Sequence, residues 1–280
     1  MRYLIVILFF SACTMNEECS FDSEQTEVNG HRGLRGHFPE NSIYGFEKTV
    51  EKGLYRLELD IILTADSQWV IYHDPSINPE LCSVGEPIPI FDITYDSLSR
   101  IGCGTLASAR FPEQEKRTHG IPRLLDYFQR FQDHPAADSL THIIEIKSPK
   151  TYPTSDKPDS DTMVELFLEL VRGQGMDEQV VLQSFDPEVL NAFRLVEKDI
   201  PILYLIEEME SIDQALSLLT ASPEYVGMYH PLYDESVVSK LHQQGIEAVA
   251  WTVNDWPTIE RLSCLGVDHV MSDYHWPQTH

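Results

Sequence analysis

The stretch Leu57-Glu58-Leu59-Asp60-Ile61-Ile62 places two acidic side chains inside an otherwise apolar run. In an extended strand, side chains two positions apart point to the same side. Glu58 and Asp60 therefore share one face, and the apolar side chains share the other. Burying an unpaired carboxylate costs several kcal/mol, so the acidic face needs a compensating partner.

Short β-branched runs alternate with longer helical patterns along the chain. The expected strands cover 27–31, 56–62, 142–147, 179–184, 201–206, 224–229, 246–252 and 268–272. The helical patterns between them cover 42–52, 122–132, 161–173, 187–197, 211–220, 234–243 and 256–265. Strands that alternate with helices form a parallel sheet, and eight such units predict an α/β fold closed into a (β/α)8 TIM barrel. The length of 280 residues suits a single barrel domain.

A second expected strand carries charge on one face. Glu145 and Lys147 lie two positions apart in His142-Ile143-Ile144-Glu145-Ile146-Lys147. Three inward carboxylates (Glu58, Asp60 and Glu145) repel one another, and Lys147 cannot neutralise them all. All-oxygen ligands favour a hard divalent cation, Mg²⁺ or Ca²⁺. The alternative is a structural ion-pair cluster with Lys147 and Arg32.

One segment interrupts the alternation. Residues 69–74 are expected to form a hairpin partner of the preceding strand, and residues 75–120 contain Pro, Gly and two cysteines but no long periodic run. We expect 75–120 to be an insertion after the second strand that lies over the barrel mouth. Cys82 and Cys103 both lie in it, and we expect a disulfide between them in an oxidising compartment.

The first residues predict export. Met1-Arg2 is followed by the short apolar run 3–10, which ends in Ser11-Ala12-Cys13 and resembles a bacterial lipobox. We expect residues 1–12 to be a signal peptide, Cys13 to be lipidated, 13–26 to be a polar tether and 27–280 to be the barrel domain. The alternative is an ordinary cleaved signal with an incidental Cys13. Either way, the expected location is the bacterial cell envelope, in the periplasm or on the outer surface.

The overall charge restricts the partners. The chain has 45 acidic and 20 basic residues, which give a net charge of −25. This charge argues against nucleic acid and anionic membrane surfaces as partners, so we expect membrane contact only through the lipid anchor. A small anionic substrate stays compatible with the sequence if its site is locally positive.

Several short motifs in the expected strand ends and loops belong together. They are His31-Arg32-Gly33, Pro39-Glu40-Asn41-Ser42, Gly45-Phe46, Glu58-x-Asp60, Thr64-x-Asp66, His73-Asp74, Glu145-x-Lys147, Gln183-Ser184-Phe185 and Trp251-Thr252-Val253-Asn254. In this order and spacing, over about residues 28–274, the set resembles the glycerophosphodiester phosphodiesterase family. Each motif alone is weak, and the set is highly specific.

The resemblance implies a (β/α)8 barrel that holds one divalent ion and acts on a small-molecule glycerophosphodiester. It also implies roles for ten residues of this chain. The ion would be held by Glu58, Asp60 and Glu145, protons would be moved by His31 and His73, and the phosphate would be bound by Arg32 and Lys147. Glu40 and Asn41 would orient His31 or the metal site, and Trp251 would form a wall against the glycerol or the leaving group.

The implied reaction is metal-dependent hydrolysis to glycerol 3-phosphate and an alcohol, with two imidazoles as general acid and base. Attack by the neighbouring glycerol hydroxyl through a cyclic phosphate is favoured by its high effective molarity, and attack by water fits the sequence equally well.

A related phosphodiesterase acting on lysophospholipids, phosphoinositides or sugar phosphodiesters is the alternative function. A glycoside hydrolase also uses paired carboxylates but has no need of the histidines, arginine and lysine. An inactive binding lipoprotein would lack one or more of five residues, and all five are present: His31, His73, Glu58, Asp60 and Glu145.

Overall fold

The structure is a computed structural model that describes residues 21, 25–105, 110–152 and 157–276. The expected signal peptide, Cys13 and most of the expected tether lie outside these residues. Within the tether, the Phe21 ring packs 5.1 Å from the ring of Trp256, and the buried Thr26 hydroxyl donates to the Val267 carbonyl at 2.7 Å. Over the described ranges, no helix is long and apolar enough to cross a bilayer.

Eight parallel strands form the expected barrel. They are β1 (Glu27–His31), β2 (Arg56–Leu63), β8 (Thr141–Ile146), β9 (Val180–Ser184), β10 (Ile202–Ile206), β11 (Tyr225–Tyr229), β12 (Glu247–Trp251) and β13 (His269–Ser272). The sheet closes because β1 pairs in parallel with both β13 and β2. The predicted (β/α)8 barrel is confirmed, and each strand end lies within one residue of the expected range.

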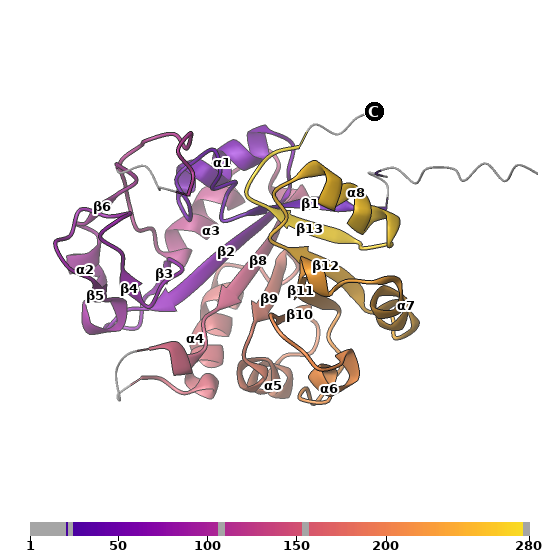
Figure 1. Ribbon diagram of the computed structural model, residues 1–280. Helices are drawn as coiled ribbons and strands as arrows, with labels where there is room; N and C mark the ends of the chain where they lie inside the picture. The colour runs from indigo at the N-terminus through magenta and orange to yellow at the C-terminus, as the bar shows by residue number, and fades with distance from the viewer. Residues whose placement is uncertain (1–20, 22–24, 106–109, 153–156, 277–280) are drawn as a thin grey trace, which may run out of the picture.

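Helices cover the outside of this ring of strands (Figure 1). They are α1 (Ile43–Glu51), α3 (Leu124–Gln132), α4 (Ser160–Gly173), α5 (Pro187–Val196), α6 (Ile212–Leu216), α7 (Glu235–Gln243) and α8 (Trp256–Cys264). Helix α4 buries Met163, Phe167 and Val171, which recur every fourth residue and form one face toward the strands. Asp186 caps α5 by accepting from the Glu188 N–H, with Pro187 at the first helical position.

The strands divide their side chains between two cores. Leu57, Leu59 and Ile61 on β2 are fully buried in the core that the helices cover. A smaller cluster, which includes Leu205 and Met271, fills the interior of the barrel. Because the apolar side chains of β2 occupy the outer core, the alternating acids of that strand face inward.

The segment after β2 departs from the barrel pattern. Strand β3 (Trp69–Ile71) runs antiparallel to β2 as expected. Residues 75–120 contain the short elements β4 (Ser76–Ile77), β5 (Ile88–Pro89), η1 (Ile90–Asp92), α2 (Tyr95–Leu98), β6 (Gly102–Cys103) and β7 (His119–Gly120). Cys82 and Cys103 are joined by a disulfide, with their Cα atoms 3.9 Å apart. The Gln114 amide donates to the Arg35 carbonyl at 2.6 Å, which ties the end of this segment to the loop after β1.

Candidate active site

A cavity of about 550 Å³ opens at the carboxyl ends of the barrel strands. All eight strands, or the loops that directly follow them, contribute to its lining. This end of a TIM barrel is where catalytic residues from different strands converge.

Three buried acids meet beside this cavity, and Glu58 and Glu145 line it. Glu58, Asp60 and Glu145 each offer a carboxylate oxygen, and the three oxygens lie within 4.8 Å of one another. The strand register explains this, because Asp60 on β2 lies beside Glu145 on β8. Burial and the neighbouring Asp60 raise the pKa of Glu58 well above its usual range. Oxygens that surround one hard cation at roughly 2.0–2.6 Å can lie up to about 5 Å apart, so this donor set fits a single Mg²⁺ or Ca²⁺.

Two cations lie against these acids. Lys147 Nζ is 2.7 Å from a carboxylate oxygen of Asp60 and 2.7 Å from one of Glu145, and Arg32 Nε is 3.1 Å from the other oxygen of Asp60. Burial opposes ionisation of Asp60, but Arg32 and Lys147 lower its pKa well below the usual range. Three carboxylates and two cations sum to a formal charge of −1. A divalent ion would change that sum to +1, which a singly charged phosphodiester would neutralise.

Hydrogen bonds fix the acids in place. Asn41 donates from Nδ2 to Asp60 at 2.9 Å, so it orients the acidic cluster as one of the two predicted roles requires. Gln183 donates to Glu58 at 2.6 Å, and the Arg32 backbone N–H donates to the other oxygen of Glu58 at 3.0 Å. These bonds hold the carboxylates in one geometry before any ligand arrives.

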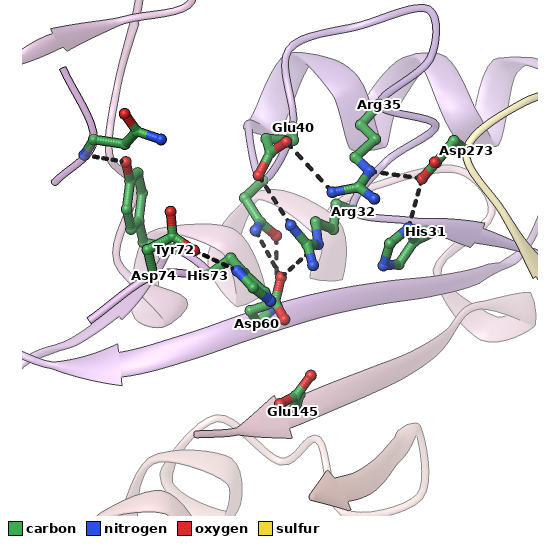
Figure 2. Close-up of polar contacts among 12 residues, drawn as sticks. His31, Arg32, Arg35, Glu40, Asp60, Tyr72, His73, Asp74, Glu145 and Asp273 are labelled. Carbon is green, nitrogen blue, oxygen red and sulfur yellow. Dashed lines mark hydrogen bonds and ion pairs between the residues drawn. The ribbon is translucent and has the colours of Figure 1, made fainter. Parts of the chain in front are cut away.

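Glu40 lies with the arginines rather than with His31. It accepts a hydrogen bond from Arg32 Nη1 at 3.2 Å, and its second oxygen is 3.8 Å from Arg35 Nη1 (Figure 2). The group beside His31 is instead Asp273. Glu40 therefore orients Arg32, the expected phosphate contact.

His31 forms a buried pair with Asp273. Its Nδ1 is 2.6 Å from Asp273 Oδ1, which also accepts from Arg35 Nε at 2.7 Å. Burial lowers the pKa of His31 to about 4, against the opposing effect of Asp273. His31 is therefore neutral at pH 7. The carboxylate at Nδ1 favours the tautomer with its proton there, which leaves Nε2 as a proton acceptor, 3.9 Å from Glu58.

His73 has a matching partner in a more open position. Its Nδ1 is 2.6 Å from Asp74 Oδ1, and the two side chains are 36% and 40% exposed. Figure 2 shows Arg32 and Asp60 between His73 and His31, in agreement with the strand order β1-β2-β3. Both predicted histidines line the cavity, one on each side of the acidic cluster.

Sequence reasoning gave no role to Asp273, Arg35 or Asn254. Asn254 Nδ2 donates to Asp273 Oδ2 at 2.7 Å, so the carboxylate that holds His31 is itself held on both oxygens. The predicted barrel could have indicated that Asp273 lies beside His31. Because the last strand of a closed barrel pairs with the first, the residue after β13 must lie beside the end of β1.

Three aromatic rings line the other side of the cavity: Phe185, Tyr229 and Trp251. Trp251, for which the family resemblance implies a wall against the glycerol or the leaving group, stands at the end of β12. We call Glu58, Asp60, Glu145, Arg32 and Lys147 the charged half of the mouth. We call Phe185, Tyr229, Trp251 and the adjacent Glu207 the aromatic half.

Comparisons with known proteins identify the family of this chain. The family model of the glycerophosphoryl diester phosphodiesterase family matches residues 31–275. A glycerophosphodiester phosphodiesterase of Bacillus subtilis is 25% identical over 250 residues, which cover 87% of this chain and 82% of that protein.

Solved structures share the fold. A Silicibacter pomeroyi crystal structure assigned to glycerophosphoryl diester phosphodiesterases has 27% identity and a TM-score of 0.81, and the match covers 91% of this chain and 92% of that one. An Oleispira antarctica phosphodiesterase in complex with the product sn-glycerol-3-phosphate has 20% identity and a TM-score of 0.72, over 90% of this chain and 94% of that one. The chain therefore belongs to the glycerophosphoryl diester phosphodiesterase family, whose members are phosphoric diester hydrolases.

Proposed function

We propose that this protein hydrolyses glycerophosphodiesters to glycerol 3-phosphate and an alcohol, and that it depends on one divalent cation. The observation that carries the proposal is a cluster of three buried acids and two cations that borders a cavity lined by both imidazoles. The product found in the Oleispira antarctica phosphodiesterase supports the same substrate class.

Glu58, Asp60 and Glu145 would hold the cation, which when bound supplies positive charge against the phosphate oxygens. Arg32 presents its planar guanidinium beside the cluster and can bind two phosphate oxygens at once, while Lys147 acts as a point charge. The negative charge that grows on the phosphate during attack is thus met by groups already in place.

The two imidazoles divide the proton transfers. We assign His31 Nε2 as the base, because burial keeps the ring neutral and Asp273 holds the proton at Nδ1. His73, on the opposite side of the cluster, would then protonate the leaving alcohol. Asp74 lies 2.6 Å from its Nδ1 and orients the ring.

We favour attack on phosphorus by the substrate's own glycerol hydroxyl, which sits on the carbon adjacent to the one that bears the ester oxygen. This hydroxyl is held close to phosphorus by the substrate itself, which gives it a high effective molarity. It would displace the alcohol and form a five-membered cyclic phosphate, which water then opens with the histidines in exchanged roles. A diester that lacks this hydroxyl is expected to bind without being cleaved. Cleavage of that analogue at a rate near the natural one would instead establish direct attack by water.

The test of the overall function is release of glycerol 3-phosphate from a panel of glycerophosphodiesters. Activity should disappear after exhaustive chelation and return when Mg²⁺ or Ca²⁺ is added. The panel should include lysophospholipids, phosphoinositides and sugar phosphodiesters. Hydrolysis of one of these without hydrolysis of any glycerophosphodiester would overturn the substrate class, and full activity after chelation would overturn the metal dependence.

We further propose that the enzyme is exported to the bacterial cell envelope and anchored through lipidated Cys13. The signal-like run 3–10 supports export, as do the Cys82–Cys103 disulfide and the disulfide-bonded state of Cys264. The native protein should partition with membranes, because the several acyl chains of a lipoprotein anchor firmly, and Cys13→Ser should not. Native mature protein free in solution would contradict the anchor.

A further inference from the structure

The aromatic half of the mouth takes no part in the proton and phosphate chemistry proposed above. Phe185, Glu207, Tyr229 and Trp251 stand at or just after the ends of β9, β10, β11 and β12, four strands that are neighbours in the barrel. All four side chains line the cavity. The charged half comes from β1, β2 and β8, so the two halves face each other across one opening.

The three rings form an angled wall. The ring centroids of Phe185 and Trp251 are 5.4 Å apart with planes inclined at 86°, and those of Tyr229 and Trp251 are 5.9 Å apart with planes inclined at 44°. Phe185 and Tyr229 are 39% and 44% exposed, unusually open for large apolar side chains. Rings inclined to one another can present more than one π face to a single ligand.

The position of the central ring, Trp251, is fixed by packing. Trp251 packs against the cluster that fills the barrel interior, which includes Leu205. Gly227 on β11 leaves room for two leucines of that cluster, since a Cβ there would lie 2.8 Å from the Cδ2 atoms of Leu203 and Leu205. The wall is therefore formed before a ligand binds.

The charge at this wall is negative. Glu207 is exposed at the end of β10 and lines the cavity, and Glu208 and Glu210 follow it in the chain. An acyl chain would gain nothing from a carboxylate at this place, an anionic alcohol would be repelled by it, and a neutral alcohol could only donate hydrogen bonds to it. A cation gains from the carboxylate and from the π faces together.

We propose that the aromatic half is a subsite for a leaving alcohol that carries a quaternary ammonium group, as choline does. This inference rests on the proposed function, because it places the phosphate at the charged half and the ammonium group across the cavity. The cavity of about 550 Å³ accommodates a diester of that size. Cation–π contact with Tyr229 and Trp251, together with the Glu207 carboxylate, selects this alcohol over neutral ones.

The test compares two substrates of the same shape. Glycerophosphocholine and its 3,3-dimethylbutyl isostere differ only in the charge of one central atom. We expect the wild type to favour the choline ester by about tenfold in kcat/KM. Tyr229→Leu and Glu207→Gln should each reduce this preference severalfold, and Tyr229→Phe, which keeps the ring, should retain most of it. Equal turnover of the two esters by the wild type would overturn the proposal, as would a preference that survives both Tyr229→Leu and Glu207→Gln.

A matched control uses Tyr55, which is 42% exposed just before β2 at the opposite end of the barrel. Tyr55→Leu should leave the preference unchanged. Binding of tetramethylammonium, followed by calorimetry, tests the subsite without any turnover and should be lost in Tyr229→Leu. If neither ester releases glycerol 3-phosphate while tetramethylammonium still binds at Tyr229, the proposed function fails and the subsite stands. If both esters are cleaved equally and tetramethylammonium does not bind, the subsite fails and the function stands.

Discussion

The two halves of the mouth are built in opposite ways. In the charged half, the acids, Arg32 and Lys147 are all at most 9% exposed, and each side chain is held by an ion pair or a hydrogen bond. In the aromatic half, Phe185 and Tyr229 are about four times more exposed. Groups that stabilise developing charge act best when they are fixed and dry, whereas groups that select an alcohol must stay open to it. This difference in exposure indicates that the charged half performs the chemistry and that the aromatic half selects the alcohol.

The largest expected effect comes from breaking the charged half. Glu145→Gln removes one carboxylate of the cluster and one partner of Lys147. We expect kcat/KM to fall roughly 10³-fold for every glycerophosphodiester, because the cation and the phosphate both lose a fixed charge. The control is Glu247→Gln at the amino end of β12, which should keep wild-type rates. A loss of less than tenfold in Glu145→Gln would contradict the metal site.

A smaller effect is expected from the groups that orient the imidazoles. Asp273→Asn should lower kcat by about 100-fold with little change in KM, because His31 loses the buried carboxylate that sets its tautomer. Asp74→Asn should cost less than Asp273→Asn, since water can replace the half-exposed Asp74 beside His73. Equal losses in the two variants would show that burial does not distinguish the two pairs.

The buried imidazoles on the strands of the charged half should also make the fold sensitive to acid. His142 on β8 lies against the Tyr127 hydroxyl, and burial lowers its pKa to about 3. The unfolded chain has a histidine pKa near 6.5, so it binds more protons than the folded chain between about pH 6.5 and pH 3, and stability falls as the pH falls through that window.

Urea unfolding at pH 7.5 and pH 5 measures this effect. The free energy of unfolding should drop between the two pH values by about 2 kcal/mol more in the wild type than in His142→Gln. The wild type and His142→Gln share the same active-site acids. Subtracting one drop in the free energy of unfolding from the other therefore cancels the contribution of those acids. Identical drops in the two proteins would show that His142 is not buried as a neutral ring.

The fold was predictable because its signals are local. Most strands of the barrel are short apolar runs, and the alternation of Glu58 and Asp60 with leucines already placed the acids on the inner face. Capping residues such as Asp186 marked where helices begin. The acids, Arg32, Lys147 and both histidines came from the motifs. The structure brings them together: all but Asp60 and Lys147 line one cavity, and Lys147 pairs with Asp60 and with the lining residue Glu145.

The parts that the sequence did not assign depend on contacts between distant residues. His31 and Asp273 are 242 positions apart, and only the register of a closed barrel brings them together. Arg35 has no local pattern that separates it from a surface arginine. Phe185 was quoted only as part of a motif, and Tyr229 stands singly at a strand end, so only the order of β9–β12 in the barrel shows that they share a wall with Trp251.

We assign the chemistry to the charged half of the mouth and the selectivity to the aromatic half. The most direct test is the ratio of kcat/KM for glycerophosphocholine to kcat/KM for glycerophosphoglycerol. Arg32→Lys alters the phosphate contact, because a lysine cannot bind two oxygens with a planar fork, and it should lower both values while leaving their ratio unchanged. Tyr229→Leu should lower the ratio severalfold. A ratio that moves as far in Arg32→Lys as in Tyr229→Leu, or one that Tyr229→Leu leaves unchanged, would contradict the separation of chemistry from selectivity.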